Sequence, residues 1–157
     1  MKREGRSIDV ANRHPRLRID RRALAEAVCA LDANAGRFRG GCPPGGLSVA
    51  FLPDHALAGL HARYLGDPSA TDVITFSGDA ANMVAGEICV SVDAAERHAR
   101  RTGARLSDEI TLYVIHGWLH LAGYDDRKPA DRRAMRRAEA RAMRLLARSA
   151  KPRFKLA

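Results

Sequence analysis

The sequence predicts an α+β domain in which a small mixed β-sheet of about four strands is surrounded by about five helices. Short β-branched or alternating segments and amphipathic segments follow one another irregularly along the chain, a pattern that favours one sheet with covering helices. The length of 157 residues suits a single domain, which we place at 1–157. The hydrophobic fraction of 46% is ordinary for a globular protein and too high for a disordered basic chain.

The N-terminal part of the chain is expected to contain a strand, a helix and a loop. Residues 8–10 alternate between apolar and acidic side chains and predict a first strand. Asp20 can cap a helix that runs to about Asn34, because apolar side chains recur on one face of this segment. Residues 36–46 contain too many glycines and prolines for regular structure and are expected to form a loop.

The next segment predicts a strand followed by a helix. Residues 47–52 form an apolar run that Pro53 ends. Asp54 can then cap a helix that extends to Tyr64. Residues 66–69 have the composition of a turn.

Two strands separated by a loop are expected in the centre of the chain. Residues 73–76 are β-branched and aromatic and predict a strand, whereas residues 77–85 are expected to form a polar loop. Residues 87–92 alternate and predict another strand. The side of this strand expected to be buried carries Ile88, Val90 and Val92. Asp93 can cap the helix that follows, which ends near Gly103.

The most apolar helix of the chain comes next. Ser107 is expected to cap it, with Asp108 and Glu109 in the first turn, where acidic side chains interact favourably with the helix dipole. Gly123 is expected to end it. Trp118, within this helix, is expected to lie in the core.

The positive charge of the chain is concentrated in its C-terminal fifth. The formal net charge is +9, and residues 127–157 contain twelve basic and only two acidic residues. They predict a basic helix whose apolar stripe consists of Met135, Ala138, Ala142, Leu145 and Leu146. Residues 153–157 are expected to be a frayed tail.

The other side of this helix carries an arginine ridge, which we define as Arg133, Arg137, Arg141, Arg144 and Arg148. Such a ridge suits an anionic partner, nucleic acid first and a membrane surface second, although a solvated helix face has the same pattern. No run approaches the roughly 20 apolar residues that cross a bilayer. The N-terminus also lacks the apolar region of a secretory signal. We therefore expect a cytoplasmic protein with no membrane partner.

A candidate metal site lies at the end of the apolar helix, in the arrangement H-x-x-x-H-x-x-G-x-x-D. His116 and His120 are four residues apart, so they lie on one helix face about 6 Å apart along the axis and can bind one cation. Gly123 lets the chain turn back, and Asp126 can then offer a third ligand. Two histidines and one carboxylate leave a position open for water or substrate, as in catalytic zinc sites.

The spacing is that of the metzincin zinc motif H-E-x-x-H-x-x-G-x-x-H with two substitutions. Gly117 replaces the glutamate that acts as general base in those proteases, and Asp126 replaces the third histidine. A bound metal can still lower the pKa of water towards 7 and polarise a phosphoryl oxygen. Phosphodiester hydrolysis therefore suits the site at least as well as peptide hydrolysis.

The same stretch resembles the H-G-x-L-H-L-x-G-Y-D-H signature of the YbeY family of bacterial rRNA maturation factors, and departs from it only at Asp126. Upstream, residues 71–76 are similar to the family's T-D-V-L-S-F strand and residues 86–88 to its G-D-I. Single residues that fit family positions are Glu109, Met135 and Glu139. The resemblance covers nearly the whole chain.

The resemblance implies a single-domain, zinc-dependent endoribonuclease with a small mixed sheet surrounded by helices. It implies one Zn²⁺ per chain, held by His116, His120 and Asp126. The implied substrate is single-stranded RNA, and the implied role is maturation of the 3′ end of small-subunit rRNA and ribosome quality control. The implied partners are rRNA and the small ribosomal subunit or ribosomal proteins, and DNA is not expected.

Two departures from the family bear on activity. Asp126 is an anionic ligand, which we expect to make the metal less Lewis-acidic and to admit Mn or Fe more readily. The family's N-x-x-Y-R segment aligns with residues 61–65, so that Leu65 occupies the position of an arginine considered important for activity. We expect Arg63, or one of the C-terminal arginines, to contact the phosphate instead.

Two other functions fit parts of the sequence. A metal-stabilised, non-cleaving ribosome-associated RNA-binding factor is favoured by Leu65 and opposed by the open coordination position. A metalloprotease is disfavoured by Gly117, which cannot act as a general base.

Overall fold

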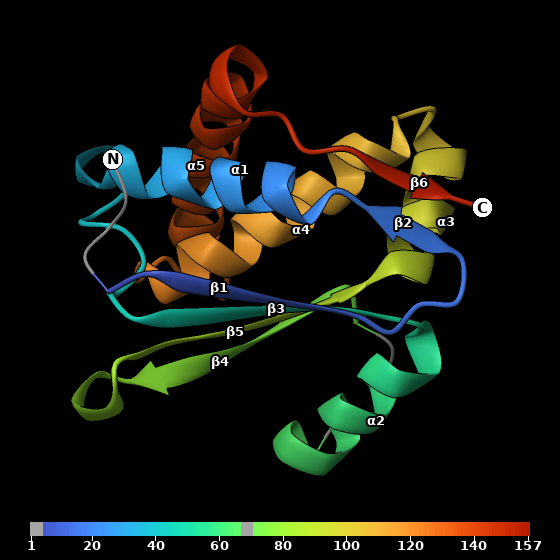
Figure 1. Ribbon diagram of the computed structural model, residues 1–157, viewed down its shortest axis with the longest axis horizontal. Coiled ribbons are helices and arrows are strands. Elements are labelled where there is room, and N and C mark those ends of the chain that lie inside the picture. Colours follow the sequence, from blue (N-terminus) through green and yellow to red (C-terminus); the bar gives the residue numbers. More distant parts are fainter. Residues whose placement is uncertain (1–4, 67–70) are drawn as a thin grey trace.

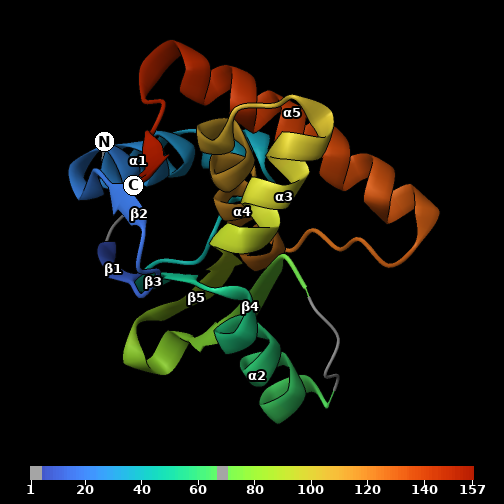
Figure 2. The ribbon, with the colours of Figure 1, turned by 90° about the vertical axis from the view of Figure 1, so that its right-hand side faces the viewer.

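A four-stranded sheet lies between one helix on one face and four helices on the other in the computed structural model, which describes residues 5–66 and 71–157 (Figure 1). Helix α2 covers one face, and α1, α3, α4 and α5 lie on the other side (Figure 2). The strands are β1 Ser7–Asn12, β2 Leu17–Ile19, β3 Gly46–Leu52, β4 Val73–Asp79, β5 Val84–Ser91 and β6 Phe154–Leu156. The helices are α1 Arg21–Ala33, α2 Asp54–Leu65, α3 Val92–Thr102, α4 Leu106–Leu121 and α5 Pro129–Ser149. The predicted α+β class is confirmed.

The sheet is mixed and has the strand order β1–β3–β5–β4. Strands β1, β3 and β5 are parallel, whereas β4 runs antiparallel to β5. The inner strand β5 is buried on both faces, because Ile88 and Val90 join the core under α1, α4 and α5 while Cys89 joins the core under α2. The predicted alternation of this strand implied one buried face, but helices cover both faces and Cys89 is as buried as Ile88 and Val90.

The first two predicted helix caps have different outcomes. Asp20 caps α1 as predicted, because its side chain accepts a hydrogen bond from the Ala23 N–H. Asp54 was expected to cap α2 but is instead its first residue, preceded by Pro53 at the N-cap. Its carboxylate is used in a tertiary contact, where it accepts a 2.6 Å hydrogen bond from the hydroxyl of Ser91.

The caps predicted for α3 and α4 are also wrong, for the same reason. Ser91 caps α3, so Val92 is helical, while Asp93 accepts a 2.8 Å hydrogen bond from the backbone N–H of Asp54 at the start of α2. Ser107 lies inside α4, and its hydroxyl exchanges two 2.9 Å hydrogen bonds with the backbone of Phe154. Each polar side chain satisfies a backbone group that is remote in sequence.

Two segments expected to be irregular are ordered strands. The predicted loop 77–85 is the tip of a hairpin, in which β4 extends to Asp79 and a 3₁₀ turn leads into β5 at Val84. The predicted frayed tail contains β6, which pairs antiparallel with β2. The Ala157 N–H then donates to the carbonyl of Arg16 at 2.8 Å. Local composition does not encode this pairing, because its two strands lie at opposite ends of the chain.

The turn predicted at residues 66–69 is described only at its start. Gly66 ends α2 in the left-handed conformation, with a φ of 69°, and residues 67–69 lie outside the described part of the chain. Among the helices of residues 5–66 and 71–157, none combines the length and apolar character needed to cross a membrane.

A buried ion pair ties the N-terminus, α1 and α4 together. Arg6 donates from Nε to Asp32 at 2.9 Å, and both side chains are fully buried. The indole N–H of Trp118 donates to the same carboxylate at 3.2 Å. Trp118 itself is fully buried, so the prediction that it belongs to the core is confirmed.

Removal of the central carboxylate is therefore expected to be costly. Asp32→Ala leaves the Arg6 guanidinium buried without its counter-charge, which should lower the free energy of unfolding by about 3–5 kcal/mol. Urea denaturation measures this loss. The control Glu26→Ala breaks only the exposed α1 pair with Arg22 and should change stability by no more than about 0.5 kcal/mol. Equal effects of the two substitutions would contradict a stabilising role for the buried pair.

Candidate metal centre

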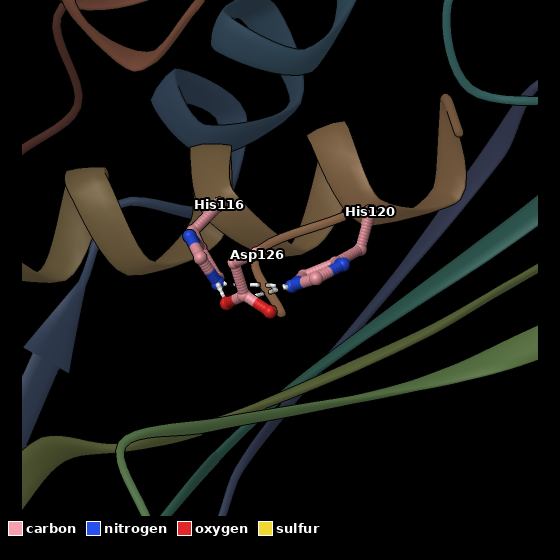
Figure 3. Close-up of side chains that lie close together, drawn as sticks. All are labelled: His116, His120 and Asp126. Atoms are coloured by element: carbon pink, nitrogen blue, oxygen red, sulfur yellow. Dashed lines mark hydrogen bonds and ion pairs between the residues drawn. The ribbon is translucent and has the colours of Figure 1, made fainter. Parts of the chain in front are cut away.

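Helix α4 places the two predicted histidine ligands on one face, one turn apart (Figure 3). The ring centroids of His116 and His120 are 4.6 Å apart, and their Nε2 atoms are separated by 3.0 Å. Both side chains are about one quarter exposed, which leaves the nitrogens open to one side of the helix. The predicted helical spacing therefore brings the two nitrogens close enough to share one ion.

The turn after α4 brings the third predicted ligand back to the histidines. Gly123 adopts a φ of 102°, a conformation that favours glycine, directly after the end of the helix. Asp126 Oδ2 then lies 3.3 Å from His116 Nε2 and 3.4 Å from His120 Nε2. One ligand atom from each of the three residues lies within 4.8 Å of the others.

Helix α5 supplies a residue that orients the site. Glu139 Oε2 lies 3.0 Å from Nδ1 of His116. An ionised carboxylate can only accept a hydrogen bond, so Nδ1 carries a proton, and in the neutral ring Nε2 is the nitrogen left with a lone pair, on the side of Asp126 and His120. Carboxylates commonly orient metal-binding histidines in this way.

The electrostatic environment of His116 favours a positive charge. Burial lowers the pKa of this histidine, but its hydrogen bond to Glu139 and the charges of Glu139 and Asp126 outweigh burial and raise that pKa above its usual value. The same two carboxylates would stabilise a cation held between the rings. Two imidazole nitrogens and one carboxylate oxygen form a donor set that suits zinc.

The site opens into a hollow of about 430 Å³ beside the start of β4. Thr71, Asp72, Val73, Leu112 and Tyr113 line it together with the three candidate ligands and Glu139. A small ligand or a short segment of polymer can therefore approach the three donor atoms from the side of β4.

Gly117, between the histidines, has a packing role that its position in the motif did not reveal. A Cβ atom at this residue would lie 2.5 Å from Cγ2 of Ile88 and 3.1 Å from Cγ2 of Thr75. Helix α4 therefore approaches β5 and β4 so closely that only glycine fits. Residue 117 therefore has no room for the glutamate that the metzincin motif carries at this position.

The structure does not bring Arg63 together with the three candidate ligands. Arg63 lies on α2 and lines a separate hollow with His55 and Glu87, against the sheet face opposite α4. Leu65, at the end of the same helix, is 58% exposed. Among the described residues, the hollow at the metal centre contains no arginine.

Glu139 was noted in the sequence only as part of a family pattern. One signal could have singled it out, since it is one of two acidic residues in a segment with twelve basic ones. Beyond the first turn of α5, which holds Asp131, Glu139 is the only carboxylate of the helix, and such a position favours a specific interaction. Its partner His116 lies 23 residues earlier and could not be named from local pattern.

Comparison with known proteins identifies the family. A family model described as "Endoribonuclease YbeY" matches residues 9–147. The chain belongs to the YbeY family. Relatives named endoribonuclease YbeY include those of Anaeromyxobacter sp. strain Fw109-5, with 32% identity over 85% of this chain and 69% of the relative, and Rhodopirellula baltica, with 37% identity over 83% and 66%. The chain thus spans about two thirds of the length of these relatives.

Two further comparisons concern the sequence and the fold. The YbeY relative of Thermobifida fusca is 33% identical over 82% of this chain and 86% of its own length. The solution structure of TM1509 from Thermotoga maritima is similar in fold, with a TM-score of 0.61 and 22% identity over 90% of this chain and 91% of that one. The YbeY family therefore accounts for most of the chain.

Substitution of Gly117 tests whether its close packing holds the site-bearing helix. Gly117→Ala places a methyl group against Ile88 and should lower the free energy of unfolding by about 1–3 kcal/mol. The matched control Gly59→Ala, in α2 with no atom within 4 Å of the added carbon, should raise stability by about 0.5–1 kcal/mol. Chemical denaturation compares both variants with the wild type. A Gly117→Ala protein as stable as the wild type would show that the contact does not limit the approach of α4.

Proposed function

We propose that this protein is a zinc-dependent endoribonuclease that cuts single-stranded RNA and acts in the cytoplasm. Its role would be maturation of the 3′ end of small-subunit rRNA and ribosome quality control, with the small subunit or its proteins as partners. The observation that carries the proposal is the convergence of His116, His120 and Asp126 at the edge of a hollow. Family membership supports RNA as the substrate, because the relatives are named endoribonucleases.

The three residues would hold one zinc ion through two imidazole nitrogens and one carboxylate oxygen. Zinc bound there would lower the pKa of a water molecule and polarise a phosphoryl oxygen. Glu139 keeps the proton of His116 on Nδ1 and so directs Nε2 to the centre. Gly117 leaves α4 without the glutamate of the zinc proteases, which makes peptide hydrolysis a poorer match.

The phosphate contact is proposed to come from Arg63 or from the C-terminal arginines. Arg63 lines a different hollow from that of the metal centre. For Arg63 to contact a phosphate bound at the metal centre, α2 would have to move or the RNA would have to extend to the other hollow. Seven of the nine arginines in residues 127–157 lie on α5, the helix that also carries Glu139. This shared helix favours them over Arg63.

The rival function, a metal-stabilised factor that binds ribosomal RNA without cutting it, uses the same three ligands for stability alone. Leu65 favours it, since the family has an arginine there. The two functions differ in one measurable respect, which is metal-dependent cleavage.

Metal content tests the ligand assignment. The purified protein should contain about one zinc per chain by elemental analysis, and His116→Ala should lose it. Glu139→Gln should retain zinc but bind it about 10- to 100-fold more weakly in competition with a chelator, because the orienting carboxylate is lost. His55→Ala, a histidine outside the site, serves as the control and should match the wild type. A full complement of tightly bound zinc in His116→Ala would refute the site.

RNA cleavage tests the activity. The zinc-loaded protein should cut single-stranded RNA, and His120→Ala should reduce the rate by at least about 100-fold, as expected when a metal ligand is removed. Single-stranded DNA of the same sequence should remain intact. Assays with Mn²⁺ and Fe²⁺ should show whether Asp126 allows either metal to support cleavage.

Further arms of the same assay separate the alternatives. Equal cleavage by the wild type and His120→Ala would indicate a contaminating nuclease, and binding without cleavage would favour the non-cutting factor. A lower rate in Arg63→Gln would assign the phosphate contact to α2, and a higher rate in Leu65→Arg would show that the missing arginine limits activity. Metal-dependent cleavage of casein would support the alternative function of a metalloprotease.

A further inference from the structure

A cationic groove lies on the flank of α5 away from Glu139. It is a hollow of about 230 Å³ between α5 and the 3₁₀ turn Ala35–Arg37. We define the arginine groove by its lining residues, which are Arg37, Phe38, Arg141, Arg144, Leu145 and Arg148. Four of these six lining residues are arginines and none is acidic.

One of these arginines is held in place by its neighbours. Arg141 donates from Nη2 to the carbonyl of Arg37 at 3.2 Å and lies 3.3 Å from the hydroxyl of Tyr124. Its guanidinium also lies over the ring of Phe38, 5.6 Å from the centroid. Arg141 thereby joins the two walls of the arginine groove.

The other three arginines are available to a ligand. Arg37, Arg144 and Arg148 are exposed, and no ion pair found within residues 5–66 and 71–157 involves them. Positive charges without counter-charges around a hollow attract anions.

The larger hollow beside β6 lacks this property. It measures about 840 Å³ and is also rich in basic residues, but Asp20 and Asp108 are part of its wall. Lys151 pairs with Asp108 at 2.9 Å, so part of its charge is already neutralised. The arginine groove is therefore the better anion site of the two.

The arginine ridge continues from this groove along α5. Arg137 and Arg133 are exposed and continue the ridge towards the N-terminus of α5. From Arg133 to Arg148 the ridge extends about 22 Å along the helix axis. Arg127 and Lys128, also exposed, then follow directly after the candidate ligand Asp126. Positive side chains thus continue from the groove along α5 to the segment that follows Asp126, while Glu139 reaches the metal centre from the opposite flank of the same helix.

We propose that the arginine groove binds backbone phosphates of a single-stranded RNA whose scissile segment lies at the metal centre. The inference rests on the proposed function for the identity of the polymer. A chain of regularly spaced phosphates matches arginines on successive turns of α5. Phe38 is fully buried and therefore offers no surface on which a base can stack. The groove binds charge and does not distinguish bases.

Equilibrium binding in the presence of a chelator tests the groove without cleavage. Fluorescently labelled oligo(A) and oligo(U) are titrated with the full-length protein at several salt concentrations. Arg144→Gln/Arg148→Gln removes two exposed charges from the groove. Arg22→Gln/Arg100→Gln removes two exposed charges on α1 and α3 and is the matched control. Arg144→Lys/Arg148→Lys keeps the charge in the groove.

The groove variant should bind both oligomers on the order of 25-fold more weakly at about 0.1 M salt, and the slope of log K against log[salt] should become less steep by about 1.4. The control and the lysine variant should keep a slope near that of the wild type. Thermal unfolding should show that all three variants remain folded, because the substituted side chains are solvent-exposed.

Two results would overturn the proposal: a groove variant that binds like the control, or a loss confined to one of the two oligomers. The outcome is separable from that of the proposed function. A wild-type protein that binds RNA through the groove but does not cut it when loaded with zinc would leave the groove intact and reject the nuclease. Zinc-dependent cutting combined with unchanged RNA binding by the groove variant would support the nuclease and reject the groove.

Discussion

Helix α4 can lie against the sheet only because residue 117 has no side chain. A Cβ atom there would meet Ile88 at 2.5 Å, so the helix would have to move away from β5. The contacts made by the other faces of α4 depend on this close approach to the sheet. Trp118 reaches the buried carboxylate of Asp32, while His116 and His120 turn towards the returning loop and α5. One glycine thus sets the distance at which three other contacts are made, and interiors are too closely packed to absorb a shift.

Helix α5 carries charges of both signs on opposite flanks, and the two sets have different roles. One flank of this helix directs Glu139 to His116, where a carboxylate favours a cation. The other flank presents the arginine ridge, where guanidinium groups favour an anion. A nuclease needs both, because its metal and its substrate have opposite charges. Placing the two sets on one rigid helix keeps them apart and at a constant distance, which limits their mutual neutralisation.

Local patterns predicted element types better than element ends. The segment 47–52 and the apolar helix were found from their apolar composition and from the residues that bound them, such as Pro53 and Gly123. Three caps were misplaced because Asp54, Asp93 and Ser107 use their oxygens on backbone or side-chain groups far away in sequence. Strand β6 was missed because its partner β2 lies at the other end of the chain. Hydrogen bonding to a remote group leaves no trace in the neighbouring residues.

The sequence by itself determined the three candidate ligands, because His116, His120 and Asp126 lie within eleven residues and a helical turn followed by a glycine brings them together. It also determined the family, through the same short motif. Only the tertiary structure decided that Gly117 serves packing, that Glu139 orients His116, that Arg63 faces another hollow, and that Arg37 joins α5 in a groove. These four depend on which surfaces of the sheet and helices meet. Such contacts are set by the packing of the whole chain, and the spacing of a few residues cannot specify them.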